Sequence, residues 1–228
     1  MEKSKQSVWL ITGAAGTLGR ELVRQVLNAG ADCVALDRNT RGLNQLHDQM
    51  VDEGLQPPAL YPLDLVGAGP DDYANLAATL EEHFGRLDVL VHGAAAFTAL
   101  RPLEHQAADE WFEILQSGLT GPFLLTNALM PLLRASATGR IALINNTDCL
   151  EMPARWGAYG VAQAGRRQMA RSLAAELGPR GPRVHEIDPG PFFSPLRSAA
   201  WPAQTQDELP SAAAAAGRVC QAINQGEH

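Results

Sequence analysis

Residues Val8 to Arg20 read VWLITGAAGTLGR, an apolar run that ends in a glycine-rich turn and opens directly into an amphipathic pattern. The apolar run predicts a buried strand, and the pattern after the turn predicts a helix over 17–28. Glycines let a backbone turn sharply and approach a pyrophosphate, whose charge is favoured by the free N–H groups at the start of a helix. The stretch therefore predicts a dinucleotide-binding turn, although on its own it would also fit an ordinary strand-to-helix turn. The residues predicted to contact the nucleotide here are Gly13, Ala15, Gly16, Thr17, Leu18 and Gly19.

A second apolar run, Cys33 to Leu36, ends in an acidic residue, Asp37. Its distance from the glycine turn is about that expected for a carboxylate that binds the ribose hydroxyls of a dinucleotide. Asp37 therefore favours NAD, which carries a free 2′-hydroxyl. The neighbouring Arg38 could instead receive a 2′-phosphate, so NADP remains the alternative cofactor.

The whole chain has the length and composition of one large α/β domain. It has 228 residues, no linker rich in Pro, Gly or Ser, and no apolar run long enough to span a membrane. The start, MEKSKQS, has no signal-peptide pattern, so we predict a cytoplasmic protein without a membrane partner. The net charge of −7 argues against nucleic-acid binding. Three scattered cysteines without CxxC spacing favour buried or idle thiols over a disulfide or a metal site, at Cys33, Cys149 and Cys220.

Strand and helix patterns alternate from the glycine turn to about residue 190, which is typical of a parallel sheet covered by helices on both faces. The strands are predicted near 8–12, 33–37, 58–61, 87–92, 140–145 and 183–187. We expect residues 1–197 to form a dinucleotide-binding domain. Residues 198–228 are an alanine-rich C-terminal segment, with a weak helix over 211–224, a loose end and no further strand pattern.

Further candidate site residues follow the predicted strands, because ligands of open α/β sheets bind at the carboxyl ends of the strands. Asp64, with Leu65 beside it, would meet an adenine, although Asp64 would equally serve as a cap for the following turn. An unusually polar loop, Asn145 to Asp148, follows the fifth strand. The remaining predicted cofactor contacts are Gly93, Ala94, Ala95, Pro189, Gly190 and Ser194.

A long helical pattern over 103–134 is interrupted at Gly118, Gly121 and Pro122. Pro122 cannot donate the hydrogen bond that the carbonyl of Gly118 would accept in a regular helix, so this carbonyl is freed at a kink. A water or a ligand could use it. The alternative is a kink that only follows the core.

A second helical pattern, 155–177, carries Tyr159 and Gln163 on one face, because these residues are four apart. A cationic cluster follows them in the same helix. We predict that it forms a solvated or subunit-facing stripe rather than an anion site. Its members are Arg166, Arg167 and Arg171.

Together these motifs resemble the short-chain dehydrogenase/reductase family over roughly residues 7–197. The resemblance rests on TGAAGTLG at 12–19, Asp64, LDVLVH at 87–92, WGAYGVAQ at 156–163 and DPG at 188–190. It implies a Rossmann-type single domain with a doubly wound parallel sheet, an NAD(P) cofactor and a small alcohol or carbonyl substrate. It also implies a homodimer or homotetramer built on the helices 103–134 and 155–177. The last strand of the family is missing from the pattern.

The catalytic tetrad that the resemblance implies, Asn, Ser, Tyr and Lys, is degraded in this chain, and only Tyr159 is in place. Gln163 replaces the lysine four residues later, the serine falls on Asn146 with Thr147 beside it, and the asparagine of the long helix falls on Gly118. Two cofactor motifs differ as well: Gly93-Ala94-Ala95 stands where the family has Asn-Ala-Gly, and Thr17 stands where classical members have a glycine.

Loss of the lysine weakens the predicted chemistry, because an isolated tyrosine has a pKa near ~10 and is a poor base at neutral pH. Gln163 can hold the nicotinamide ribose but cannot lower that pKa. No lysine follows Lys5, although Arg155 would supply a charge if its loop folded inward. Asn146 or Thr147 can still polarise a carbonyl by hydrogen bonding.

Three functional hypotheses follow. In the first, the chain binds NAD(H) but has weak or no classical carbonyl or alcohol turnover. In the second, it is an active, divergent NAD(P)-dependent oxidoreductase that uses Tyr159 with a site rebuilt from Thr147 and either Asp148 or His92. The third is an interaction protein that holds no cofactor.

Overall fold

The computed structural model describes residues 6–225; Lys3 and Lys5 and the last part of the C-terminal end, 226–228, lie outside this range. The strands are β1 (Val8–Thr12), β2 (Asp32–Asp37), β3 (Ala59–Pro62), β4 (Val89–His92), β5 (Arg140–Ile144) and β6 (Arg183–Ile187). The helices are α1 (Thr17–Asn28), α2 (Thr40–Asp52), α3 (Pro70–His83), α4 (Ala108–Leu115), α5 (Gly121–Ala135), α6 (Asp148–Glu151), α7 (Gly157–Leu177), α8 (Pro195–Ala200) and α9 (Ala212–Asn224).

The six strands form one sheet in the order β3-β2-β1-β4-β5-β6, and all neighbouring pairs are parallel. The strand order reverses between β1 and β4, which is the point where doubly wound sheets bind ligands. The predicted Rossmann-type, single-domain α/β fold is confirmed. Within residues 6–225 no strand follows β6, so β6 is an edge of the sheet.

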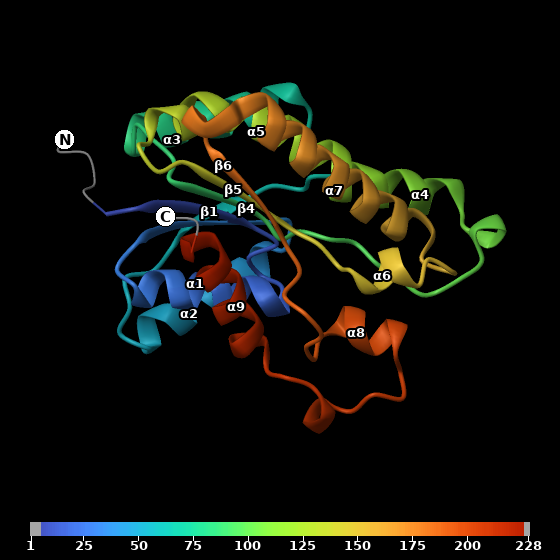
Figure 1. The fold of residues 1–228 in the computed structure, drawn as a ribbon. Helices are drawn as coiled ribbons and strands as arrows, with labels where there is room; N and C mark the ends of the chain where they lie inside the picture. The colour runs from blue at the N-terminus through green and yellow to red at the C-terminus, as the bar shows by residue number, and fades with distance from the viewer. Residues whose placement is uncertain (1–5, 226–228) are drawn as a thin grey trace.

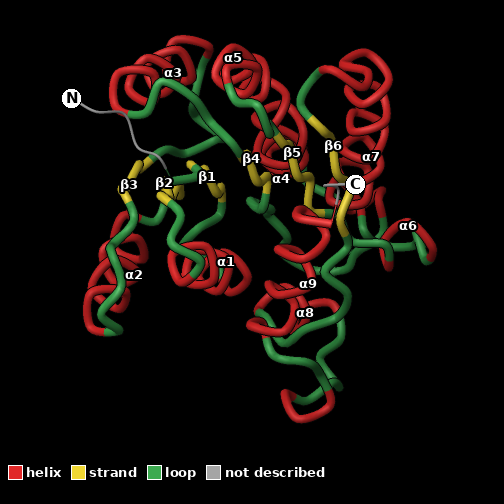
Figure 2. Tube along the Cα trace, turned by 60° about the vertical axis from the view of Figure 1, so that its left-hand side comes forward, coloured by secondary structure: helices red, strands yellow, loops and turns green. Residues whose placement is uncertain are grey.

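Helices cover both faces of the sheet. Figure 1 shows α3, α5 and α7 on one side and α1, α2 and α9 on the other, and Figure 2 shows the same two layers from another direction. Successive residues of β1 point to opposite faces: Val8 and Leu10 pack under α3 and α5, whereas Trp9 and Ile11 pack against α1. A strand buried on both faces is apolar at every position, which is why β1 reads as a continuous hydrophobic run.

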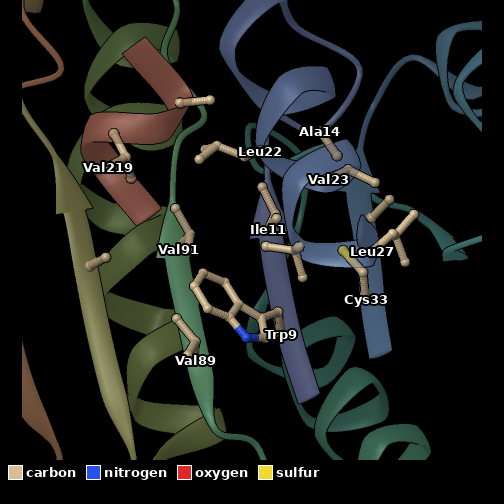
Figure 3. Close-up of a cluster of buried hydrophobic side chains, with 14 of the residues drawn as sticks. Trp9, Ile11, Ala14, Leu22, Val23, Leu27, Cys33, Val89, Val91 and Val219 are labelled. Atoms are coloured by element: carbon tan, nitrogen blue, oxygen red, sulfur yellow. The ribbon is translucent and has the colours of Figure 1, made fainter. Parts of the chain in front are cut away.

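Helix α9 completes the layer that contains α1. Its alanines allow a close approach, and Gln25 Nε2 of α1 donates to the carbonyl of Ala213 over 2.7 Å. Figure 3 shows Val219 of α9 in the same cluster as Leu22 of α1 and Val91 of β4. The C-terminal helix is therefore part of the hydrophobic core.

Two predicted helices begin later than the sequence suggests. In the first, Leu103–His105 form a separate 3-10 turn and α4 begins at Ala108. A π-turn, Gln116–Thr120, then joins α4 to α5 at the predicted kink. In the second, α7 begins at Gly157 because Arg155 has a left-handed backbone, with φ of 73°. Arg155 is exposed, so its loop does not bring the charge of this residue inward.

None of the helices in the described part of the chain is both long enough and apolar enough to cross a membrane.

Candidate cofactor and active site

A cavity of about 700 Å³ lies at the carboxyl edge of the sheet. Its walls come from the β1–α1 turn, the segments that follow β2, β4, β5 and β6, and the first turns of α7. Every residue that the sequence predicts to contact a dinucleotide lines this cavity, from Gly13 at one end to Ser194 at the other. Its volume lies within the range typical of ligand and cofactor sites.

The glycine turn brings α1 close to the end of β4. Gly13 has φ of 73°, and a Cβ there would lie 2.9 Å from the backbone of Ala94. A Cβ on Gly19 would lie 2.8 Å from Ala14 Cα, so α1 can pack this tightly against the turn only with glycine. No side chain of the described residues caps the start of α1, at Gly16. The first N–H groups of α1 therefore remain available for an anion in the cavity.

Thr12 is a site-building residue that the sequence reasoning missed. Its Oγ1 donates to the carbonyl of Val91 over 3.3 Å and accepts from the backbone N–H groups of Gly93 (3.1 Å) and Ala94 (3.2 Å). One hydroxyl thus joins the end of β1 to the loop after β4. The sequence feature that could have indicated this role is the position of Thr12 directly before the glycine turn.

Asp37 ends β2 at the rim of the cavity. Its Oδ2 accepts from the N–H of Ala15 over 3.0 Å, and its Oδ1 accepts from the N–H of Asn39 over 2.9 Å. These two bonds fix the carboxylate beside the glycine turn. Arg38 is exposed and lines the same rim. Both residues that bear on the choice between NAD and NADP are therefore at one end of the cavity.

Tyr159 lies at the other end, almost fully buried in a group of aromatic rings. Its ring centroid is 5.3 Å from that of Phe97 and 5.6 Å from that of Trp156. Burial raises the pKa of Tyr159 to about 12, and a hydrogen bond to its hydroxyl from Asn146 Nδ2, 3.4 Å long, opposes this shift. The phenol is consequently protonated at neutral pH.

Gln163 and Asn146 complete the part of the tetrad that the structure brings together. The backbone N–H of Asn146 donates to Gln163 Oε1 over 3.2 Å, and Gln163 is buried. Asn146, Tyr159 and Gln163 all line the cavity. The other two predicted catalytic positions do not line it: Thr147 donates its N–H to Asp188 Oδ2 over 2.6 Å, and Gly118 is buried in the π-turn.

Arg166 corrects the prediction of a solvated arginine stripe. Its side chain is only 1% exposed. Nε and Nη2 donate to the carbonyl of Gly118 over 3.1 and 2.8 Å, so the freed carbonyl predicted at this kink is occupied by a side chain of the same protein. The prediction holds better for the rest of the cluster, because Arg171 is exposed and Arg167 forms a partly exposed ion pair with Glu186.

His92 is fully buried and lies outside the cavity lining. Its Nε2 is 2.8 Å from Thr126 Oγ1 in α5. Burial, reinforced by the charge of Arg166, lowers the pKa of His92 to about 3, so the ring is neutral at physiological pH. Asp148 does line the cavity, and its Oδ2 is 2.6 Å from Arg197 Nη1 of α8.

Helix α8 and Trp201, which follows it, form one wall of the cavity at the Tyr159 end. The guanidinium of Arg197 lies 3.5 Å from the ring centroid of Trp201, whose ring is 5.3 Å from that of Trp156. Arg197 and Trp201 line the cavity together with Phe192. This end of the cavity therefore combines apolar rings with one ion pair.

Comparison with known proteins agrees with this geometry. The family model described as short chain dehydrogenase matches residues 7–205. The oxidoreductase YciK of Escherichia coli (strain K12) is 30% identical over 200 residues, which cover 88% of this chain and 79% of that protein. The D-threitol dehydrogenase of Mycolicibacterium smegmatis is 30% identical over 203 residues, covering 89% and 76%.

Solved structures show the same likeness. A short chain dehydrogenase from Escherichia coli CFT073, complexed with NADPH, superposes with a TM-score of 0.90 at 27% identity and covers 97% of this chain and 91% of that one. Another from Shigella flexneri, complexed with NADP, superposes with a TM-score of 0.87 at 28% identity, covering 92% and 87%. Fold, cavity and sequence agree, and the chain belongs to the short-chain dehydrogenase family of oxidoreductases.

Proposed function

We propose that this chain binds a nicotinamide dinucleotide, NAD(H) in preference to NADP(H), and has weak or no classical carbonyl or alcohol turnover. The observation that carries the proposal is the surroundings of Tyr159: its hydroxyl is buried with a pKa raised to about 12, and the residue one turn along α7 is a neutral glutamine. When bound, the cofactor would supply or accept a hydride; the residues around Tyr159 decide whether a proton can follow.

Cofactor binding is supported by the shape of the cavity and by its donors. The uncapped start of α1 offers N–H groups to a pyrophosphate, and Gly13 and Gly93 let the glycine turn and the loop after β4 pack closely together at the cavity. The Asp37 carboxylate, fixed by Ala15 and Asn39, would accept from the hydroxyls of an adenosine ribose and repel a 2′-phosphate.

NADP(H) is the alternative cofactor. The structural neighbours described above were solved with NADP or NADPH. Arg38 at the rim is the residue of this chain that would pair with a 2′-phosphate.

Weak turnover is supported by the chemistry of a phenol with a pKa near 12. Such a group is a poor general acid toward a carbonyl and a poor general base toward an alcohol, because the best catalytic pKa lies near the working pH. Gln163 accepts from the N–H of Asn146 and carries no charge that would favour the phenolate. Asn146 remains placed to polarise a small carbonyl or alcohol substrate.

A divergent, active oxidoreductase is the second candidate. Asn146, Asp148 and Tyr159 line one end of the cavity, and these three are the residues that such a site would use. His92 is directed to α5 and has no place in it. An interaction protein without a cofactor is the third candidate, and nucleotide binding would exclude it.

We assign residues 1–197 to the dinucleotide-binding domain and 198–228 to a C-terminal segment, of which the described residues up to 225 contribute to one side of the cavity. Trp201 and Ala212 of this segment line the cavity, and Arg218 Nε donates to the carbonyl of Pro189 over 2.8 Å. The segment thus supports the turn that follows β6.

We also propose a homodimer or homotetramer through the helices of 103–134 and 155–177. Phe112 of α4 is 68% exposed, Phe123 of α5 is 50% exposed and Val161 of α7 is 44% exposed. Helix α4 is joined to α5 by the π-turn and packs against α7. Apolar side chains of this size on adjacent helices mark an interaction surface. Sedimentation of the chain and of Phe112→Glu tests this assignment.

The decisive experiment is a titration of the purified protein with NADH and with NADPH. Energy transfer from Trp156 and Trp201 to a reduced nicotinamide reports binding at the Tyr159 end. Saturable NADH binding, weaker NADPH binding and no turnover with a panel of small carbonyls are expected. The proposal is refuted if neither NADH nor NADPH binds at millimolar concentration. Turnover of carbonyls at ordinary rates would favour the second candidate.

A further inference from the structure

The guanidinium of Arg166 makes five hydrogen bonds, all to backbone carbonyls. Nε donates to Gly118; Nη1 donates to His92 over 3.2 Å and to Ile144 over 2.8 Å; Nη2 donates to Ala94 over 2.9 Å and again to Gly118. A guanidinium has five N–H groups in all. Every donor of Arg166 is therefore used within the protein.

The four accepting carbonyls lie where regular backbone pairing stops. His92 and Ala94 stand at and just after the end of β4, Ile144 ends β5, and Gly118 lies in the π-turn. The helical partner of the Gly118 carbonyl would be residue 122, which is a proline without an N–H. One side chain of α7 thus holds together three segments that meet beneath the cavity.

No carboxylate is among the five contacts of Arg166, so its charge is balanced only by carbonyl dipoles. Burial lowers the pKa of Arg166 to about 10, which still leaves the side chain charged at neutral pH. Arg166 lines the cavity with Tyr159. The two residues are seven apart on α7, which places them two turns apart on one face of the helix.

The titratable groups that face Tyr159 come from several segments. Burial is the largest cause that raises the pKa of Tyr159, and Cys149 of α6 and Asp188 after β6 raise it further, whereas the Asn146 hydrogen bond and the attraction by Arg166 lower it. The neighbouring Phe97 and Trp156 are neutral. Arg166 is the one cation among these groups.

We propose that Arg166 is a positioning residue for the Tyr159 end of the cavity: it holds the ends of β4 and β5 to the π-turn, and its permanent charge stabilises the phenolate of Tyr159. It acts through Tyr159 and the backbone and does not bind substrate, because it has no donor left. Its part in a reaction rests on the proposed cofactor binding, but its effect on Tyr159 does not.

The test separates the charge of Arg166 from its hydrogen bonds. Arg166→Lys keeps a cation with fewer donors, whereas Arg166→Gln has an amide and no charge. In a Tyr61→Phe, Tyr73→Phe background, Tyr159 is the remaining tyrosine. Biosynthetic replacement of tyrosine by a multiply fluorinated analogue brings its ionisation to a milder pH, where fluorine NMR follows the phenolate.

We expect Arg166→Gln to raise the ionisation pH of residue 159 by about one unit or more, and Arg166→Lys to leave it close to that of the chain with arginine. A purely structural role would shift both variants equally. Equal shifts, or none, would overturn the proposal.

A second measurement covers the case in which Arg166→Gln does not fold. Arg166→Ala is prepared with methylguanidinium chloride, which fits the space that the side chain leaves, and sodium chloride is the control. The proposal requires a higher melting temperature and a lower ionisation pH of residue 159 with methylguanidinium alone. An equal response to both salts would refute it.

Neither measurement needs a nucleotide, so the two proposals fail separately. A chain that binds no NADH would refute the proposed function while the fluorine titration still decides the role of Arg166. A chain that binds NADH but shows equal shifts in the two variants would keep the function and remove Arg166 from it.

Discussion

The end of the cavity at the β1–α1 turn is built on backbone N–H groups and the Asp37 carboxylate, whereas the end at Tyr159 is built on buried side chains from distant segments. The first end comes from residues 12–39, which are close in the chain. The second joins α7 to the ends of β4 and β5 and to the π-turn. Cofactor recognition is thus a local property of this sequence, and the chemistry at Tyr159 is not.

The largest expected effect comes from restoring the charge pattern of the family at the Tyr159 end. Asn146→Ser and Gln163→Lys together, with Arg166 kept, should raise NADH-dependent turnover of simple carbonyls by about 10²–10⁴-fold, because a lysine near the phenol lowers its pKa. The rate of NADH oxidation with a carbonyl panel measures this.

Gln163→Lys alone is the matched control for that variant. It supplies the cation without the serine hydroxyl that would polarise the carbonyl. We expect a smaller gain from it. A gain equal to that of the combined variant would show that the serine adds nothing at this site.

Removing the Arg166 guanidinium without a replacement should lower the stability of the protein. Arg166→Met leaves four carbonyls without a donor, and we expect a loss of about 3 kcal/mol in the free energy of unfolding. Urea denaturation measures it. Arg171→Met, on the exposed side of α7, is the control and should change stability by about 0.5 kcal/mol or less.

At the β1–α1 end of the cavity, the most disruptive substitution is one that introduces a steric clash rather than one that changes a charge. A Cβ at Gly19 would lie 2.8 Å from Ala14 Cα, so Gly19→Ala should cost about 2 kcal/mol, shared between folding and nucleotide affinity. Isothermal titration with NADH and thermal unfolding measure both. Gly67→Ala, where a Cβ meets nothing within 4 Å, should leave NADH affinity unchanged.

Acid should act on the Tyr159 end through His92. Its folded pKa is about 3 and its ordinary value is 6.5, so below pH 6.5 the unfolded chain takes up a proton that the folded chain refuses. Stability is therefore lost as the pH falls from 6.5 toward 3, by up to about 1.4 kcal/mol per pH unit. His92→Gln should flatten this dependence in urea melts between pH 6.5 and 4.5.

The smallest effect concerns the choice of nucleotide. Asp37→Ala removes the carboxylate that would repel a 2′-phosphate, and the ratio of NADPH to NADH affinity should rise about tenfold or less. Arg38→Ala should lower NADPH affinity and leave NADH affinity nearly unchanged. If Asp37→Ala leaves the ratio as it was, Asp37 does not select the cofactor.

Most of the fold could be predicted from the sequence because its signals are local. Buried parallel strands are continuous apolar runs. The turn between β1 and α1 is predictable because its glycines allow the sharp change of direction. The predicted strand 33–37 differs from β2 by a single residue at its start. The kink near Gly118 was also predictable, because Pro122 removes a specific hydrogen bond.

Arg166 could not be predicted, because a charged residue in a helix with two further arginines reads as surface. Its burial depends on carbonyls that lie 22 to 74 residues away in the chain. The conformation of Arg155 could not be predicted for a related reason. Its left-handed backbone belongs to the loop before α7, and helical periodicity does not indicate it. A site where backbone carbonyls of several distant segments meet cannot be predicted from local sequence patterns.

The edge of the sheet at β6 also bears on how copies of this chain can meet. An unpaired strand can template the addition of another strand and so lead to aggregation. β6 reads RVHEI, with Arg183, His185 and Glu186 on a strand of five residues that follows Pro182. Charges and a short length are the features by which natural sheets discourage such growth. The addition of a further strand at this edge is thereby disfavoured.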